Sequence, residues 1–182
     1  MNPGLFDNLS EEKPAPMLDP QTIDRAVDVL RGRIDSKLDD GIRCPCCDKY
    51  VKRYRRKFNA SMARSLIWLV REWKAERHTA GWIDVPNSAP RWLLRTNQLP
   101  TVRWWGLIER ADNEDETIKH SGYWRPTPKG ELFAMRAVSI PKTAITYNGE
   151  VVGFDDELCW IDECLGVKFN YSDLMSGYNG TD

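Results

Sequence analysis

Three cysteines stand close together in the first third of the chain, and cysteine thiolates are strong ligands for zinc. They are Cys44, Cys46 and Cys47. Cys44 and Cys47 have the spacing of a zinc knuckle, and an alternating strand follows them. A structural zinc site needs four ligands, so the others would come from Cys46, from His78 and His120 if folding brings them close, or from a second copy of the chain. Thiols that only pack are the alternative.

The two remaining cysteines lie far along the chain. We expect Cys159 and Cys164 in one short helix, Leu158 to Leu165, where five residues turn the chain by about 140° and put the two side chains on different faces. An odd total of five cysteines does not suit a disulfide framework. Free thiols or a metal indicate a reducing compartment, so we expect a cytoplasmic protein.

A dense basic run follows the cysteine cluster. It comprises Lys52, Arg53, Tyr54, Arg55, Arg56 and Lys57, five cations around one aromatic ring. Such a run suits contacts to nucleic-acid phosphates, with the ring available for stacking. A solvated linker or strand face is the alternative.

A second group of polar residues could read DNA bases. Two short helices are expected from Ser88, the second starting near Leu99 and reaching Trp105. Arginine can grip guanine, and asparagine or glutamine can read adenine, so the candidates are Arg91, Arg95, Thr96, Asn97, Gln98, Thr101 and Arg103. Lys119, His120 and Arg125 could touch the phosphate backbone. The alternative is the solvated face of an amphipathic helix, with Trp104, Leu107 and Ile108 in the core and Trp105 on either side.

Charge is distributed unevenly although the net charge is only −1. Residues 43–77 carry eleven Lys/Arg against three Asp/Glu, whereas residues 143–182 carry one against eight. A basic middle between acidic ends can hold phosphate, and the acidic end could also dock on a basic partner protein.

Sequence signatures of catalysis are absent, so we expect no enzyme. The chain has no phosphate-binding glycine-rich loop and no nucleophile or metalloprotease motif. The carboxylates Asp155, Asp156, Glu157, Asp162 and Glu163 could hold a metal, but a solvated helical face is the expected interpretation. No apolar run reaches the roughly 20 residues of a membrane helix.

Other elements follow from periodicity and capping. Residues 1–18 are expected to be a flexible arm, and a helix should run from Asp19 and Pro20 to Leu38. A second helix, capped by Asn59 or Ser61, should reach about Arg77, with a short strand at 81–85. Asn148 and Gly149 predict a type I′ hairpin within 144–154, and a last helix is expected at 171–175.

Two motifs resemble the winged helix-turn-helix core of MarR- and PadR-type regulators. They are the segment Trp105–Glu109, with its Gly-Leu-Ile step, and Thr127–Gly130. The resemblance covers about residues 60–136 and implies DNA binding, usually as a dimer. The acidic tip of the predicted wing, 111–116, departs from that pattern. The whole chain also resembles small uncharacterised phage and prophage proteins.

The predicted fold class is therefore α+β, a winged-helix core at 59–142 preceded by a helix, a cysteine knuckle and the basic run at 19–58. An acidic hairpin and helix appendage is expected at 143–182. The predicted function is non-enzymatic binding of double-stranded DNA, as a phage or prophage regulator. The alternative is a protein-binding adaptor or inhibitor of a host polymerase or defence enzyme.

Overall fold

The first unit of the chain contains one long helix and a small hairpin. A computed structural model describes residues 20–44, 47–75, 81–112 and 121–177, in two units, Met1–Lys52 and Arg53–Asp182. Helix α1, Pro20–Lys37, begins where the sequence predicts, although the expected cap Asp19 and the arm 1–18 lie outside the described residues. It ends where Gly41, at φ +90°, donates its N–H to the Lys37 carbonyl at 2.8 Å. Strands β1, Ile42–Arg43, and β2, Tyr50–Val51, then pair antiparallel.

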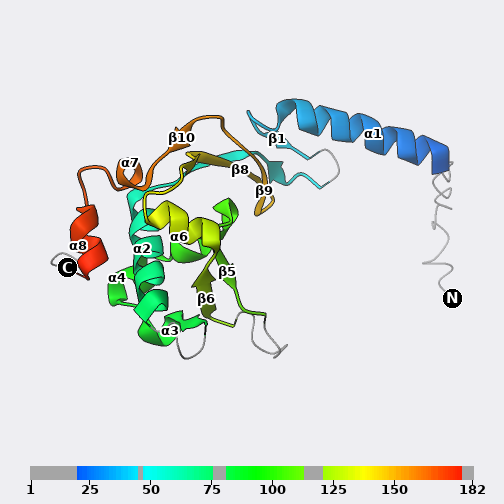
Figure 1. The fold of residues 1–182 in the computed structure, drawn as a ribbon. Helices are drawn as coiled ribbons and strands as arrows, with labels where there is room; N and C mark the ends of the chain where they lie inside the picture. The colour runs from blue at the N-terminus through cyan, green and yellow to red at the C-terminus, as the bar shows by residue number, and fades with distance from the viewer. Residues whose placement is uncertain (1–19, 45–46, 76–80, 113–120, 178–182) are drawn as a thin grey trace, which may run out of the picture. The chain divides into compact units, whose positions relative to one another are not determined.

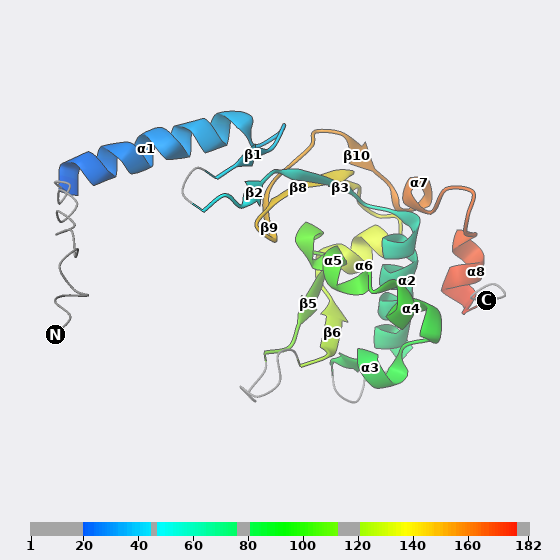
Figure 2. The ribbon, with the colours of Figure 1, turned by 180° about the vertical axis from the view of Figure 1, so that it is seen from behind.

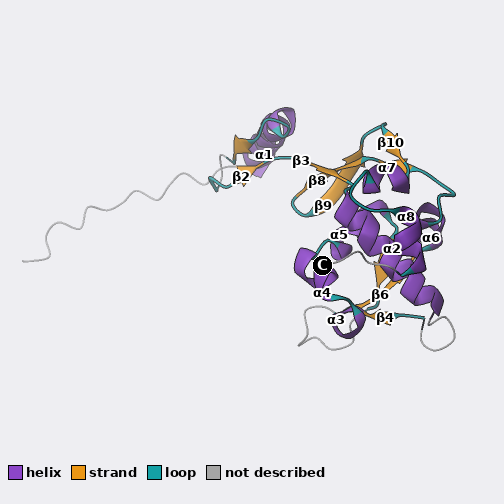
Figure 3. Cartoon of the chain, turned by 90° about the vertical axis from the view of Figure 1, so that its left-hand side faces the viewer, coloured by secondary structure: helices purple, strands orange, loops and turns teal. Residues whose placement is uncertain are grey.

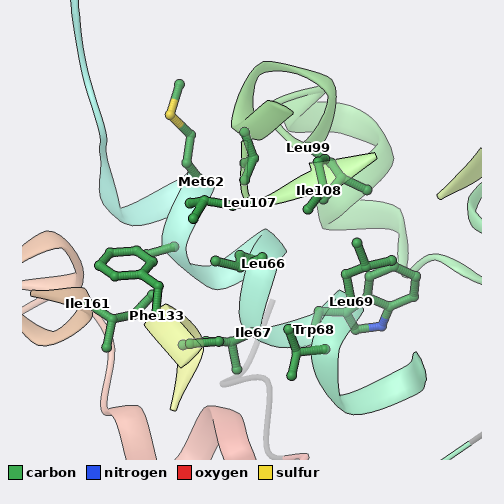
Figure 4. Packing of buried hydrophobic residues seen from close by; sticks show 14 of the residues in the cluster. Met62, Leu66, Ile67, Trp68, Leu69, Leu99, Leu107, Ile108, Phe133 and Ile161 are labelled. Atoms are coloured by element: carbon green, nitrogen blue, oxygen red, sulfur yellow. The ribbon is translucent and has the colours of Figure 1, made fainter. Parts of the chain in front are cut away.

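Helix α2, Ala60–Ala75, is the centre of the second unit (Figure 1). Its cap is Asn59, whose Oδ1 accepts from the N–H groups of Ser61 at 3.0 Å and Met62 at 3.1 Å, as predicted. The helix contacts α5, α6, α7, α8 and β6. Figure 4 shows Leu66, Ile67 and Phe133 in the resulting core. The buried set is consequently wider than one stripe: Met62, Ala63, Ser65, Leu66, Ile67, Trp68, Leu69 and Val70.

A three-stranded antiparallel sheet lies beyond α2 along the chain. Its strands are β4, Ile83–Asp84, β5, Ile108–Arg110, and β6, Tyr123–Pro126, in the order β4-β6-β5. Between β4 and β5 the chain forms α3, Val85–Ser88, α4, Arg91–Thr96, α5, Leu99–Val102, and a 3-10 turn η1, Arg103–Trp105. The predicted second helix of this pair is thus short and ends in a tighter turn. Residues 113–120, which include most of the acidic wing tip 111–116, lie outside the described part.

The two motifs noted in the sequence bind each other. The Thr127 hydroxyl donates to the Gly106 carbonyl at 2.7 Å and accepts from the Gly130 N–H at 3.0 Å, which caps α6, Pro128–Ala134. Lys129 Nζ donates to the Trp105 carbonyl at 3.1 Å. A Cβ on Gly130 would lie 1.8 Å from the Leu107 carbonyl oxygen, so only glycine fits there.

The basic run forms an edge strand of a second sheet. This strand is β3, Tyr54–Lys57, and the sheet order is β3-β8-β9, with β8 at Thr143–Tyr147 and β9 at Glu150–Phe154 (Figure 2). Asn148 at φ 51° and Gly149 at φ 81° form the predicted hairpin turn. The pairing of β3 with β8 places residues 54–57 beside the predicted hairpin, within the second unit.

The last elements include one strand where a helix was expected. Residues Leu158–Cys159 form β10, which pairs with β7, Ile140–Pro141, and helix α7 spans only Ile161–Leu165 (Figure 3). Trp160, with extended backbone at φ −93° and ψ 160°, is its cap. Helix α8, Tyr171–Ser176, closes the described part, where no helix is both long and apolar enough to cross a membrane. The fold is mixed α+β, as predicted.

Candidate nucleic-acid interface

Strand β3 and helix α5 enclose a hollow of about 540 Å³, which we call the basic groove. The two elements come from segments that the sequence marked separately as phosphate-binding and base-reading. The residues lining the groove are Arg55, Arg56, Lys57, Asn59, Met62, Gln98, Thr101 and Trp104. Folding thus brings the basic run and part of the predicted reading helix to one concave surface.

Two further hollows adjoin the groove, each sharing two of its lining residues. One of about 370 Å³ shares Thr101 and Trp104 with it and adds Arg103 and Arg110. The other, of about 440 Å³, shares Asn59 and Gln98 and adds Lys168. Of the described residues that line at least one of these three hollows, none is acidic. The cations among them are Arg55, Arg56, Lys57, Arg103, Arg110 and Lys168. A concave surface of one charge sign attracts polyanions.

The β3 side of the groove is open to solvent. All four residues of β3 are exposed, and the Arg56 guanidinium lies 5.5 Å from the Tyr54 ring centroid, a cation–π distance. Arg55 forms an ion pair with Asp155 from the segment that follows β9. Arg56 and Lys57 therefore carry the charge of this side most directly.

The opposite side is formed by α5 and η1, and here Trp104 is less buried than predicted. Trp104, expected in the core, is half-buried and lines both the groove and its neighbouring hollow. Trp105, which could have lain on either side, is the core residue. Its ring meets the Phe58 ring edge-on at 5.0 Å, and its Nε1 donates to the Pro141 carbonyl at 2.7 Å. The backbone of η1 is thereby anchored with Arg103 exposed.

Four other predicted DNA-binding residues do not line the groove itself. Arg91 and Arg95 are exposed on α4. Asn97, left-handed at φ 47°, ends α4 and lines the 370 Å³ hollow. Arg125 bonds Glu109 at 2.5 Å and stacks 4.2 Å from the Trp82 ring centroid.

Four more predicted residues are outside the set that lines the groove and its neighbouring hollows in the described part of the chain. Lys52 is the last residue of the first unit. Arg53 is half-buried at the start of the second unit. Lys119 and His120 lie outside the described residues.

Sequence reasoning missed Arg110 and Lys168. Lys168 is the only basic residue in the acidic segment 143–182, and that contrast could have singled it out. Arg110 is the last residue of β5, two residues after Ile108, and no sequence pattern separates it from an ordinary surface arginine.

The cysteine turn of the first unit has the backbone of a tight turn. The Cys44 N–H donates to the Lys49 carbonyl, and the Asp48 N–H donates to the Cys44 carbonyl, both at 2.8 Å. Cys47 is exposed, and Cys46 lies outside the described residues. Over the parts of the chain that the structure describes, no group of three or more His, Cys, Asp or Glu side chains could hold a metal ion. Zinc at Cys44, Cys46 and Cys47 stays a prediction.

Four of the five C-terminal carboxylates are exposed, as predicted, although only Asp162 and Glu163 lie on a helix. Several of them form ion pairs. Asp155 pairs with Arg55, Glu157 with Lys142 at 2.6 Å, and Asp162 with Arg136 at 2.5 Å. Glu163 accepts the Trp160 N–H at 2.9 Å and caps α7. Much of the acidic segment therefore neutralises cations of its own unit.

Cys159 and Cys164 meet, contrary to the prediction, because Cys159 lies on β10 and Cys164 on α7. Their sulfur atoms are 3.2 Å apart, with the Cys164 thiol donating. This hydrogen bond lowers the pKa of Cys159, and it raises the pKa of Cys164 together with burial.

Comparison of the chain with protein families, with curated proteins and with solved structures finds no match. Functional inference therefore rests on the residues and geometry described above.

Proposed function

We propose that this chain is a non-enzymatic DNA-binding protein that holds duplex DNA against the basic groove. The supporting observation is the set of six cations that line the groove and its two neighbouring hollows, with no acidic residue among the described lining residues. Phosphate contacts from such cations supply most of the sequence-independent affinity for DNA.

The order of the elements supports a winged helix-turn-helix as the scaffold. In that proposal α2, α4 and α5 are the three helices, and β4, β5 and β6 form the sheet that carries the wing. Helix α5 with η1 would be the reading element, presenting Gln98, Thr101 and Arg103 to base edges. The resemblance to phage and prophage proteins suggests a transcriptional regulator.

A second candidate is a protein-binding adaptor or an inhibitor of a host enzyme. The observation that favours it is a mostly apolar hollow of about 350 Å³ that adjoins the 370 Å³ hollow. It is lined by Val85, Pro86, Leu93, Leu94, Asn97, Leu99, Pro100, Gly122 and Trp124. Leu94 is 46% exposed there. In the adaptor proposal, Leu94→Glu abolishes partner binding and leaves DNA affinity unchanged.

Neutralising the β3 side of the groove tests the DNA proposal. The double variant Arg56→Gln/Lys57→Gln should weaken binding to unrelated duplexes by the same factor and flatten the plot of log affinity against log salt by about 2, one unit for each lost phosphate contact. Arg55 is kept, because its ion pair with Asp155 connects β3 to the segment that follows β9. Fluorescence anisotropy with labelled duplexes at several salt concentrations measures both effects.

The matched control is Arg136→Gln. Arg136 is already paired with Asp162 and is outside the set lining the groove and its two neighbouring hollows. This variant loses a positive charge but should keep the salt dependence of the wild type. Unchanged DNA affinity in the double variant would show that DNA does not bind in the groove.

A further inference from the structure

The two C-terminal cysteines form a dithiol at the corner between a strand and a helix. The Cys164 thiol donates a hydrogen bond to the Cys159 sulfur at 3.2 Å. In one continuous helix their Cα atoms would be about 8.6 Å apart, beyond the roughly 7 Å that a disulfide can span. The extended backbone at Trp160 replaces that helix by a corner and brings the sulfurs together.

The surroundings of this pair suit thiol chemistry rather than simple core packing. The two sulfurs line a hollow of about 390 Å³ with Lys142, Glu157, Glu163, Phe58 and Leu158. Cys159 is 2% exposed and Cys164 is half-buried, so the hollow gives access to the pair. Within the described residues, no metal-binding group of three or more ligands includes them.

The chemistry differs between the two sulfurs. The hydrogen bond from Cys164 lowers the pKa of Cys159, to which the positive charge of Lys142 also contributes, while burial and the nearby Glu163 and Glu157 carboxylates oppose the shift. The 3.2 Å hydrogen bond directs the Cys164 proton toward the Cys159 sulfur, and this geometry assigns Cys159 as the attacking sulfur and Cys164 as the resolving one.

We propose that Cys159 and Cys164 are a site of reversible oxidation, at which a small peroxide converts the dithiol into an intrachain disulfide. The Cys159 thiolate attacks a peroxide oxygen, the O–O bond breaks, and a sulfenic acid forms as hydroxide leaves. Cys164 then loses its proton and attacks the Cys159 sulfur, so that the S–S bond forms, the S–O bond breaks and water leaves. The two thiols give up two electrons, and a thiol reductant returns them.

Peptide mapping of the full-length wild-type protein tests this proposal. The reduced protein is treated with hydrogen peroxide, alkylated and digested with trypsin. Cys159 and Cys164 fall in one peptide, Thr143–Lys168, because no Lys or Arg lies between Lys142 and Lys168. Oxidation should make this peptide about 2 Da lighter and resistant to alkylation, and dithiothreitol should reverse both changes. The reaction should be about tenfold faster than loss of the exposed Cys47 thiol.

Variants separate the two roles. In Cys164→Ser, the Cys159 sulfenic acid has no resolving thiol and should be captured by dimedone, whereas Cys47→Ser should oxidise at Thr143–Lys168 like the wild type. The proposal is overturned if both thiols in the wild type remain open to alkylation when the Cys47 thiol has been consumed. Disulfides from Cys159 or Cys164 to another peptide or a second chain would overturn it equally.

Discussion

Gly130 shows how one residue decides whether the loop before β5 and helix α6 can touch. A Cβ at this position would lie 1.8 Å from the Leu107 carbonyl oxygen, which is backbone and cannot rotate away. An alanine in a helix normally stabilises it by about 1 kcal/mol relative to glycine. Here we expect the opposite sign: Gly130→Ala should lower the free energy of unfolding by about 1–3 kcal/mol because overpacking forces the backbone to shift.

Chemical denaturation followed by tryptophan fluorescence measures this change. Gly153→Ala is the matched control, since the nearest atom to its Cβ would be Ile145 Cδ1 at 3.9 Å, an ordinary contact. A Gly130→Ala protein as stable as the wild type would show that α6 does not approach Leu107 as described.

The tryptophan pair shows what single residues could not reveal in the sequence. Both Trp104 and Trp105 are large and apolar. In a helix this short, the sequence pattern does not show which of two adjacent residues faces the core. Their difference depends on Phe58 and the Pro141 carbonyl, which come from distant segments and select Trp105 for the core. The sequence therefore predicted Trp104 in the core and left Trp105 open, whereas the contacts with distant segments bury Trp105.

At the scale of elements, α5 with η1 is the segment whose function is most open to test. Arg103 is exposed and lines the hollow beside the groove with Trp104 and Arg110. If Arg103 forks onto a guanine, Arg103→Ala should cost about 1–3 kcal/mol on the best site and much less on random duplex. Competition binding with selected and random duplexes gives the two free energies.

Two other results would change the role of this element. An equal loss on both duplexes would make Arg103 a phosphate contact. If DNA affinity stays unchanged while partner-protein binding is lost, α5 and η1 are a docking surface and the adaptor proposal replaces DNA reading.

The sequence predicted elements well where local signals are strong. The cap at Asn59, the start of α1 at Pro20 and the turn at Asn148 and Gly149 each depend on neighbouring residues, and the structure confirms them. Strand β10 was wrongly predicted as part of a helix, because its two residues form a strand only through their pairing with β7. That error also hid the meeting of Cys159 with Cys164, which needs the strand-to-helix corner.

At the scale of the whole molecule, the net charge is near neutral although positive and negative side chains are unevenly distributed over the surface. The C-terminal carboxylates Asp155, Glu157 and Asp162 each pair with a cation of the same unit. Arg56 and Lys57 nevertheless remain exposed on the edge strand β3. A summed charge of −1 is therefore compatible with a groove that attracts phosphate.

The sequence could propose the ingredients of this groove but not their assembly. The basic run and the residues around Gln98 to Arg103 were identified separately from charge and side-chain chemistry. Their meeting depends on the pairing of β3 with β8, across nearly ninety residues of sequence. Long-range strand pairing of this kind leaves no local pattern, so the sequence could mark Lys168 by its charge but could not predict the shared hollow.

The central claim is that this groove binds duplex DNA through phosphate contacts, and a salt titration of the wild-type protein tests it most directly. If about four to six cations contact phosphate, log affinity should fall linearly with log salt at a slope of roughly −4 to −5. Isothermal or fluorescence titrations between about 50 and 200 mM salt cover the range in which this loss is large. Absence of binding near 50 mM salt, or an affinity that does not change with salt, would contradict the account.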